Sequence, residues 1–113
     1  MKEFLLLIRE NPSYGTEMSS KEMQDCINEH IAWVEELTKK GNYKDANPLE
    51  AAGAVIKNNV ITDGPYIESK ECVSGIYFLK ADSLEAAIEL VKDCPDLKRG
   101  NTIEVREIMQ MDV

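Results

Sequence analysis

The chain has 113 residues, which is the usual size of one domain and too short for two. Apolar residues make up 43% of it and the formal charge is −8, a composition typical of a folded, soluble, acidic protein. The negative charge disfavours binding to nucleic acid or to anionic lipid, and no apolar stretch approaches the roughly 18 residues of a membrane span. We therefore expect a single cytoplasmic domain over residues 1–113.

The first predicted strand is Lys2–Arg9, in which apolar residues point to both faces. A helix is predicted from Ser19, whose spacing to Glu22 is that of a capping box, to about Lys40, just before Gly41. Its apolar face, at a spacing of 3.6 residues, comprises Met23, Cys26, Ile27, His30, Trp33, Val34 and Leu37.

The middle of the chain contains the clearest turn signals. Residues 42–52 are interpreted as a connector with a short extended piece. The pair Asn58–Asn59 between Val55–Lys57 and Val60–Thr62 predicts a β-hairpin, because asparagine tolerates a positive φ. The segment Asp63–Tyr66 then has the composition of a tight turn.

The second half repeats the strand–helix–strand pattern. A strand apolar on both faces is predicted at Cys72–Ala81, and a helix begins at Asp82 or Ser83 and is limited by Pro95. The last strand is predicted at Thr102–Gln110. The order β-α-β-β-α-β is typical of a ferredoxin-like α+β fold with an antiparallel sheet.

The strand patterns also predict an oligomer. Two helices can cover only one face of a four-stranded sheet. At least two of the predicted strands are nevertheless apolar on both faces. The uncovered face needs a partner, so we expect a homodimer packed sheet against sheet.

The three cysteines, Cys26, Cys72 and Cys94, lie far apart and form no Cys-x-x-Cys pair, which is typical of a reduced, intracellular protein. We interpret each as a small buried apolar residue rather than a reactive thiol. One histidine and scattered cysteines provide no metal-ligand spacing, and no glycine-rich phosphate loop follows a strand. No metal or cofactor is expected.

Asp63 is the principal candidate for chemistry. Its carboxylate either acts as general base or proton donor at the mouth of a cleft, or closes an Asx-turn on its own backbone. Arg106, on the polar face of the last strand, either binds a substrate carboxylate or pairs with a neighbouring acid. The charged residues just past the turn either line the same cleft or form a solvated loop; they are Glu68, Lys70 and Glu71.

Two further residues are candidates of lower rank. His30 lies in the middle of the apolar face of the first helix, where it is either a core residue bonded to a neighbour or a catalytic partner of Asp63. Tyr77 lies on a strand and is either a packing residue or an accessory group in proton transfer.

The segment Asn58–Tyr66, followed by Lys70–Glu71 and Gly75–Tyr77, resembles the YCII-related proteins and, more narrowly, their DGPF branch, with tyrosine as the last residue of that motif. Asp82–Ala87 and Gly100–Arg106 match the family in the expected order, so the likeness covers nearly the whole chain. The resemblance implies a dimeric α/β barrel of ferredoxin-like subunits. One member of the wider group removes chloride from a chlorinated hydroxyhydroquinone with a proposed His–Asp pair. Members of the DGPF branch occur beside or fused to sigma-factor-like transcription proteins.

Two functions follow as expectations. The first is a cofactor-free enzyme acting on a small molecule in a cleft at the dimer, with Asp63 as acid or base, Arg106 as anion clamp and His30 or Tyr77 as accessory groups. The alternative is a non-catalytic dimeric module that binds a ligand or regulates a transcription protein. A measurement of catalytic turnover would distinguish the enzyme from the non-catalytic module.

Overall fold

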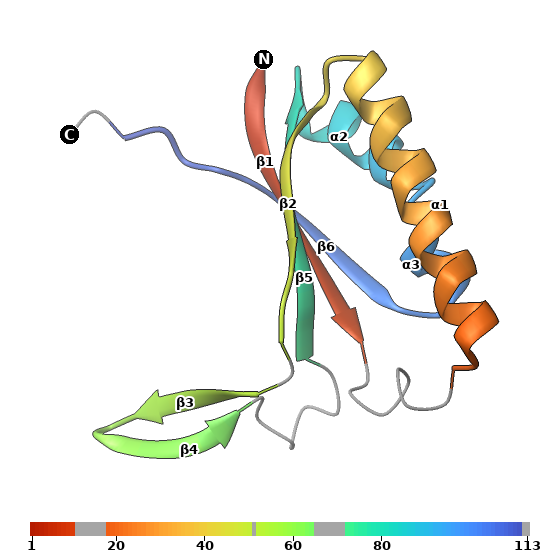
Figure 1. The fold of residues 1–113 in the computed structure, drawn as a ribbon. Coiled ribbons are helices and arrows are strands. Elements are labelled where there is room, and N and C mark those ends of the chain that lie inside the picture. The colour runs from red at the N-terminus through yellow and green to blue at the C-terminus, as the bar shows by residue number, and fades with distance from the viewer. Residues whose placement is uncertain (11–17, 51, 65–71, 112–113) are drawn as a thin grey trace.

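A four-stranded antiparallel sheet organises the fold (Figure 1). We take the fold from a computed structural model, which describes residues 1–10, 18–50, 52–64 and 72–111, with only the backbone of Asp63 and Gly64. The elements in chain order are β1 (Lys2–Glu10), α1 (Ser20–Lys39), β2 (Tyr43–Pro48), β3 (Gly53–Lys57), β4 (Val60–Gly64), β5 (Cys72–Ala81), α2 (Leu84–Val91), α3 (Pro95–Lys98) and β6 (Thr102–Glu107).

The strands of the main sheet lie in the order β2–β5–β1–β6, and each neighbouring pair is antiparallel. The three helices α1, α2 and α3 all lie on one side of this sheet (Figure 1). The predicted α+β class, with an antiparallel sheet of ferredoxin-like type, is confirmed.

The fourth strand of the sheet is β2, which lies where the sequence predicts a short extended piece within a connector. β2 pairs with β5 because Tyr43 and Ala46 lie opposite Leu79 and Tyr77 and pack against the core. The strand is otherwise polar, which an edge strand tolerates, so its composition did not indicate that it joins the main sheet.

The predicted hairpin forms as β3 and β4, but as a separate two-stranded sheet. Asn58 and Asn59 adopt φ values of 51° and 64°, the left-handed turn that their identity predicted. The turn expected after it, Pro65 and Tyr66, lies outside the described residues.

Alternation along β1 defines the face on which the core sits. Phe4, Leu6 and Ile8 are buried, whereas Leu5 and Leu7 between them are only half-buried. β5 follows the same alternation. The helices therefore cover the first set of side chains and leave the second set on the other face of the sheet.

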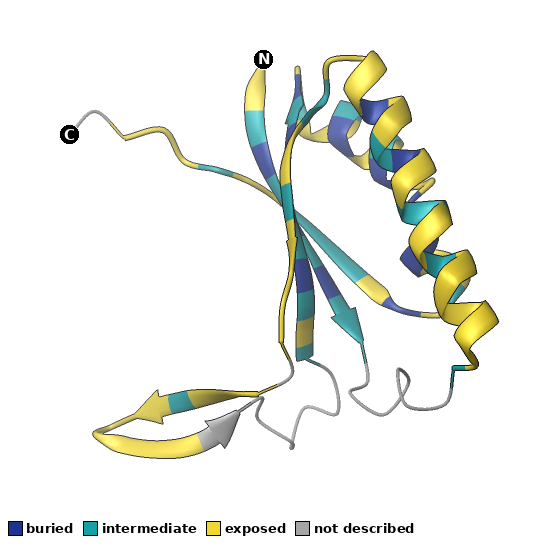
Figure 2. Cartoon of the chain, in the orientation of Figure 1, coloured by how far each residue is buried: buried dark blue, intermediate teal, exposed yellow. Residues whose placement is uncertain are grey.

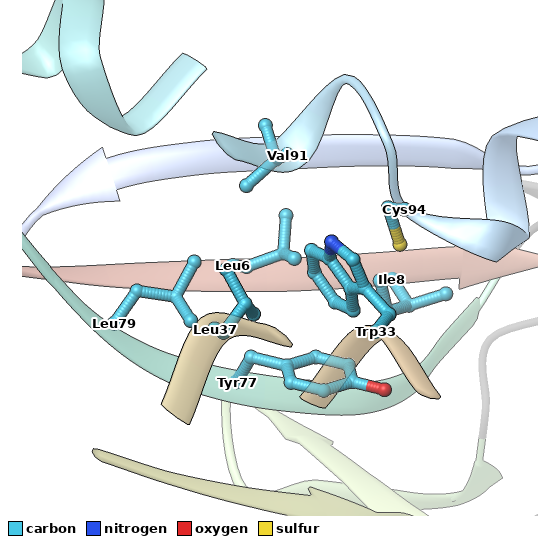
Figure 3. Packing of buried hydrophobic residues seen from close by; sticks show 8 residues of the cluster. All are labelled: Leu6, Ile8, Trp33, Leu37, Tyr77, Leu79, Val91 and Cys94. Atoms are coloured by element: carbon cyan, nitrogen blue, oxygen red, sulfur yellow. The ribbon is translucent and has the colours of Figure 1, made fainter. Parts of the chain in front are cut away.

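The main core joins the sheet to the helices (Figure 3). The rings of Trp33 and Tyr77 meet edge to face, with centroids 5.2 Å apart and planes at 70°. The buried members of this cluster are Leu6, Ile8, Trp33, Leu37, Tyr77, Leu79, Val91 and Cys94.

α1 begins where its cap predicts, since the Ser19 hydroxyl accepts a hydrogen bond from the Glu22 N–H at 3.1 Å. The predicted apolar face of α1 is covered over only part of its length. Met23 and Ile27 are 42% and 45% exposed. Figure 2 shows that burial on α1 concentrates in its C-terminal half, where the helix packs on the sheet.

The C-terminal elements are short. α2 ends at Val91, and Pro95 begins α3 rather than only limiting the preceding helix. β6 ends at Glu107, three residues before the predicted Gln110. Within the described part of the chain, none of the helices has the length and apolar character needed to cross a membrane.

Candidate functional site

An imidazole–carboxylate pair joins the two helices that lie farthest apart in the chain. His30 of α1 places Nε2 2.8 Å from Oδ2 of Asp96 in α3. Its other nitrogen, Nδ1, lies 2.8 Å from the backbone carbonyl oxygen of Cys26, one turn earlier. Both ring nitrogens are thus held, and the orientation of the ring is fixed.

Asp96 is itself fixed by several donors. It is 7% exposed, and the amide Nδ2 of Asn101 donates to its Oδ1 at 3.3 Å. The thiol of Cys94 donates to its Oδ2 at 3.6 Å, and the Asn101 N–H donates to its backbone carbonyl at 3.1 Å. A buried carboxylate held in this way keeps its charge and its position.

The hydrogen bonds favour the charged form of the pair. The bonds that Asp96 accepts from Asn101 and Cys94 stabilise its ionised carboxylate. Beside an ionised carboxylate and a backbone carbonyl, which only accept hydrogen bonds, both nitrogens of His30 act as donors. The arrangement therefore favours an imidazolium beside a carboxylate.

Both pKa values shift in the directions that this pairing requires. The hydrogen bond to Asp96 raises the pKa of His30, although burial of the ring opposes it. Burial acts to raise the pKa of Asp96, but the hydrogen bond and charge of His30, with the bonds from Asn101 and Cys94, hold it below its ordinary value. Each partner stabilises the charged form of the other.

The stability of the fold is expected to depend on pH through this pair. The pKa of Asp96 is lowered on folding, so its contribution to the free energy of unfolding is complete above its ordinary pKa of about 3.9 and is lost as pH falls through the lowered value. The pKa of His30 is raised on folding, so its contribution to the free energy of unfolding is complete below about pH 6.5 and is lost as pH rises through the raised value. Urea unfolding should therefore show the Asp96→Asn variant losing more stability relative to the parent at mildly acidic pH than at alkaline pH. An equal loss at both would contradict the ion pair.

Two thiols flank the pair without acting as nucleophiles. The Sγ of Cys26 lies 3.8 Å from Nδ1 of His30, and burial raises the pKa of this thiol. Burial raises the pKa of Cys94 to about 12. Both thiols stay protonated at neutral pH. Cys94 is buried, as the sequence predicts, whereas Cys26 is only half-buried.

The structure places the sequence-predicted residues apart. Asp63 lies near the end of β4 with its backbone opposite Ala54, and its side chain is outside the described residues. Glu68, Lys70 and Glu71 are also outside them. The acid that lies beside His30 is Asp96, whereas the sequence analysis named Asp63 as the possible catalytic partner of His30.

Arg106 and Tyr77 lie on opposite faces of the sheet. Arg106 faces the helix-free side, is 73% exposed and lies 4.0 Å from a carboxylate oxygen of Glu104. Tyr77 faces the helices and is 8% exposed against Trp33. Burial, with the nearby thiol and carboxylate groups, raises the pKa of Tyr77, so its hydroxyl stays neutral and its first role is packing.

Sequence reasoning missed Asp96 and Asn101. Asp96 stands in no motif, and its approach to His30 depends on α3 packing against α1. Asn101 lies within the Gly100–Arg106 segment of the family resemblance, but that segment gave no sign that its side chain bonds Asp96. The available signals were a histidine on a core face, which needs a partner, and the His–Asp pair proposed for one member of the wider group. In the described ranges no group of three histidine, cysteine or acidic residues is placed to hold a metal ion.

A small cavity of about 160 Å³ lies between α1 and α2. The cavity is lined by both apolar and charged residues, and His30 is not among them. The lining residues are Trp33, Glu36, Leu37, Lys40, Glu89, Leu90 and Asp93. It holds none of the residues that the sequence marked for chemistry, so the His30–Asp96 pair remains the candidate site.

The fold and the buried His–Asp pair define a small α+β protein of ferredoxin-like type with one titratable site on its helical side. The chain belongs to the YCII-related domain family, whose model matches residues 3–112. No curated protein matches the chain. A solved structure that it resembles is 5-chloro-2-hydroxyhydroquinone dehydrochlorinase (TftG) from Burkholderia phenoliruptrix AC1100, in complex with 2,5-dihydroxybenzoquinone. The likeness has a TM-score of 0.52 at 18% identity and covers 92% of this chain and 91% of that one.

Proposed function

We propose that this protein is an enzyme that acts on a small oxygenated molecule by acid–base chemistry at the His30–Asp96 pair. The observation that carries the proposal is the geometry of the pair, an imidazole whose two nitrogens lie 2.8 Å from a carbonyl oxygen and from a carboxylate oxygen. Perturbed titratable pairs of this kind are concentrated at functional sites.

The pair is suited to give up and regain one proton. In its charged form His30 is a proton donor whose Nε2–H bonds Oδ2 of Asp96 at 2.8 Å, so a substrate oxygen must displace Oδ2 as the acceptor of this proton. The transfer leaves a neutral ring whose Nδ1–H still bonds the Cys26 carbonyl. The ring therefore keeps its orientation, and Nε2 becomes the base that takes a proton back. Asp96 stabilises the charged form and orients the ring.

Exposure determines which partner meets the substrate. The side chain of His30 is 23% exposed, whereas that of Asp96 is 10% exposed, so His30 is the partner that a substrate can reach. We propose hydroxylated quinones and hydroquinones as the substrate class, because the family relative TftG was solved with 2,5-dihydroxybenzoquinone. Asp63 remains a proposed second acid or base, with Asp63→Asn as its test.

The proposal is tested with 2,5-dihydroxybenzoquinone in heavy water. Acid–base catalysis at a ring carbon exchanges its hydrogen for solvent deuterium, which proton NMR follows as loss of the ring signal. The parent is expected to accelerate this exchange, and His30→Gln to slow it at least about 100-fold, as expected for loss of a general acid–base. Glu36→Gln, a change on an exposed part of α1, is the control and should exchange like the parent.

The remaining outcomes distinguish the alternatives. Binding of the quinone without any accelerated exchange would support the non-catalytic ligand-binding module. Exchange that His30→Gln leaves unchanged would place the chemistry elsewhere and refute the assignment of this pair. If the protein neither binds the quinone nor accelerates the exchange, the proposed substrate class is refuted.

A further inference from the structure

The cavity of about 160 Å³ between α1 and α2 contains neither member of the His30–Asp96 pair. An engineered protein cavity of about 150 Å³ binds benzene, so a ligand of about six non-hydrogen atoms fits a space of this size. Part of the wall is apolar, because it is formed by the buried side chain of Leu37 and the half-buried side chain of Leu90. The charged lining residues are all exposed, so they stand where the cavity opens to solvent.

The indole of Trp33 belongs to the same wall and adds a polar group to it. The residue is only 6% exposed, and its Nε1–H makes no hydrogen bond to any described residue. Figure 3 shows the indole nitrogen pointing away from the ring of Tyr77 and toward the segment between Val91 and Cys94, which contains Asp93. Buried N–H groups in proteins are almost always paired, so this donor indicates an oxygen acceptor within the cavity.

The mouth of the cavity is acidic. Its charged residues are three acids, Glu36, Glu89 and Asp93, and one lysine, Lys40. The Nζ of Lys40 lies 3.2 Å from Oε1 of Glu36, and Oε1 of Glu89 lies 2.7 Å from Nζ of Lys92. Asp93 makes neither an ion pair nor a side-chain hydrogen bond with any described residue. The mouth therefore offers a carboxylate that has no cation, and its net charge disfavours an anionic ligand.

We propose that this cavity binds a small protonated amine that also carries a hydroxyl group. The ammonium group lies at Asp93, and the hydroxyl oxygen accepts the N–H of Trp33. The methylene groups between them pack on Leu37 and Leu90. The site is separate from the His30–Asp96 pair, so either proposal can fail without the other.

Other classes of ligand fit the cavity less well. A neutral alcohol leaves the Asp93 carboxylate without a cation, and a simple alkylamine leaves the indole N–H without an acceptor. In the part of the chain that the structure describes, no three histidine, cysteine or acidic residues are placed to hold a metal ion. An amino alcohol is the simplest compound that satisfies the carboxylate, the N–H and the apolar wall together.

The probe is 4-aminobutan-1-ol, which has the size and both polar groups that the cavity requires. Trp33 is the only tryptophan of the chain, so its fluorescence reports on the cavity directly. The probe is expected to change this fluorescence saturably at millimolar concentration, with the same dissociation constant by calorimetry. An absence of saturable binding overturns the proposal.

Two compounds of matched size test the ligand class. Pentylamine keeps the charge but lacks the oxygen, and butane-1,4-diol keeps the oxygen but lacks the charge. Each is expected to bind about tenfold more weakly than the amino alcohol, because each leaves one polar group of the cavity unpaired. If either compound binds as tightly as the amino alcohol, the proposed ligand class is overturned.

Variants test the position of the ligand. Asp93→Asn keeps the size of the side chain and is expected to weaken binding of the amino alcohol about tenfold while binding of butane-1,4-diol stays unchanged. Asp25→Asn removes the same charge from an exposed part of α1 outside the cavity, and this matched control should bind like the parent. Trp33→Phe removes the N–H, and by calorimetry it should bind the amino alcohol no better than pentylamine. Unchanged binding in Asp93→Asn, or a preference for the amino alcohol that persists in Trp33→Phe, overturns the proposed site.

Discussion

Replacing Trp33 by alanine is expected to lower the free energy of unfolding by about 3–5 kcal/mol. The indole is 6% exposed and packs edge to face on Tyr77 between α1 and the sheet, so its loss leaves a cavity at the main contact between the two layers. Domains of this size have a total stability of roughly 5–15 kcal/mol. The variant should therefore unfold at a temperature more than about 10 °C lower.

Far-UV circular dichroism is the appropriate measurement, because Trp33 is the only tryptophan and its removal eliminates the fluorescence signal. Trp33→Phe keeps an aromatic ring and should lose markedly less stability. Glu35→Ala, two residues along on the exposed side of the helix, should change the free energy by less than about 0.5 kcal/mol. A Trp33→Ala variant as stable as the parent would show that α1 does not depend on this contact.

Replacing His30 by alanine is expected to cost about 2–3 kcal/mol near pH 6, a value reduced from the usual range for buried pairs because the ring is partly exposed. The cost arises mainly from Asp96, whose buried carboxylate loses its cation. The double variant His30→Ala/Asp96→Ala should lose less than the sum of the two single variants. The difference is the coupling energy of the pair.

The exposed pair Glu36–Lys40 on the same helix provides the matched control. Its side chains are 63% and 53% exposed and the N–O distance is 3.2 Å, so solvent screens the interaction. The corresponding cycle should give a coupling energy below about 0.5 kcal/mol. A His30–Asp96 coupling energy no larger than this would show that the buried pair does not act as a unit.

Local signals in the sequence predicted most of the elements of the fold. Ser19 and Glu22 located the start of α1, and the Asn58–Asn59 pair located the hairpin, because in both cases the backbone requirement is met by residues adjacent in the chain. β2 was predicted only as a short extended piece, and its place in the main sheet was not, because that place comes from pairing with β5 and not from its own composition. The exposure of Met23 was missed because helical periodicity indicates a face but not how much of it is covered.

The candidate site was harder to predict, since its members are distant in sequence. His30 and Asp96 are 66 positions apart and meet only because α3 packs against α1. The sequence indicated that a histidine on a core face needs a partner, but several acids were available. Asp63 was favoured because a motif surrounds it, whereas Asp96 lies in one turn of helix that has no motif of its own.

The position of β1 at the centre of the sheet has a consequence for how the protein is made. Its two neighbours, β5 and β6, begin at Cys72 and Thr102, so the first strand described here pairs with the last two. The N-terminal apolar segment must therefore stay unpaired while most of the chain is synthesised, and the sheet closes only after β6 has emerged. Folding of this small protein is thus a late, largely non-local event. During synthesis the apolar segment that becomes its central strand is also its main aggregation hazard.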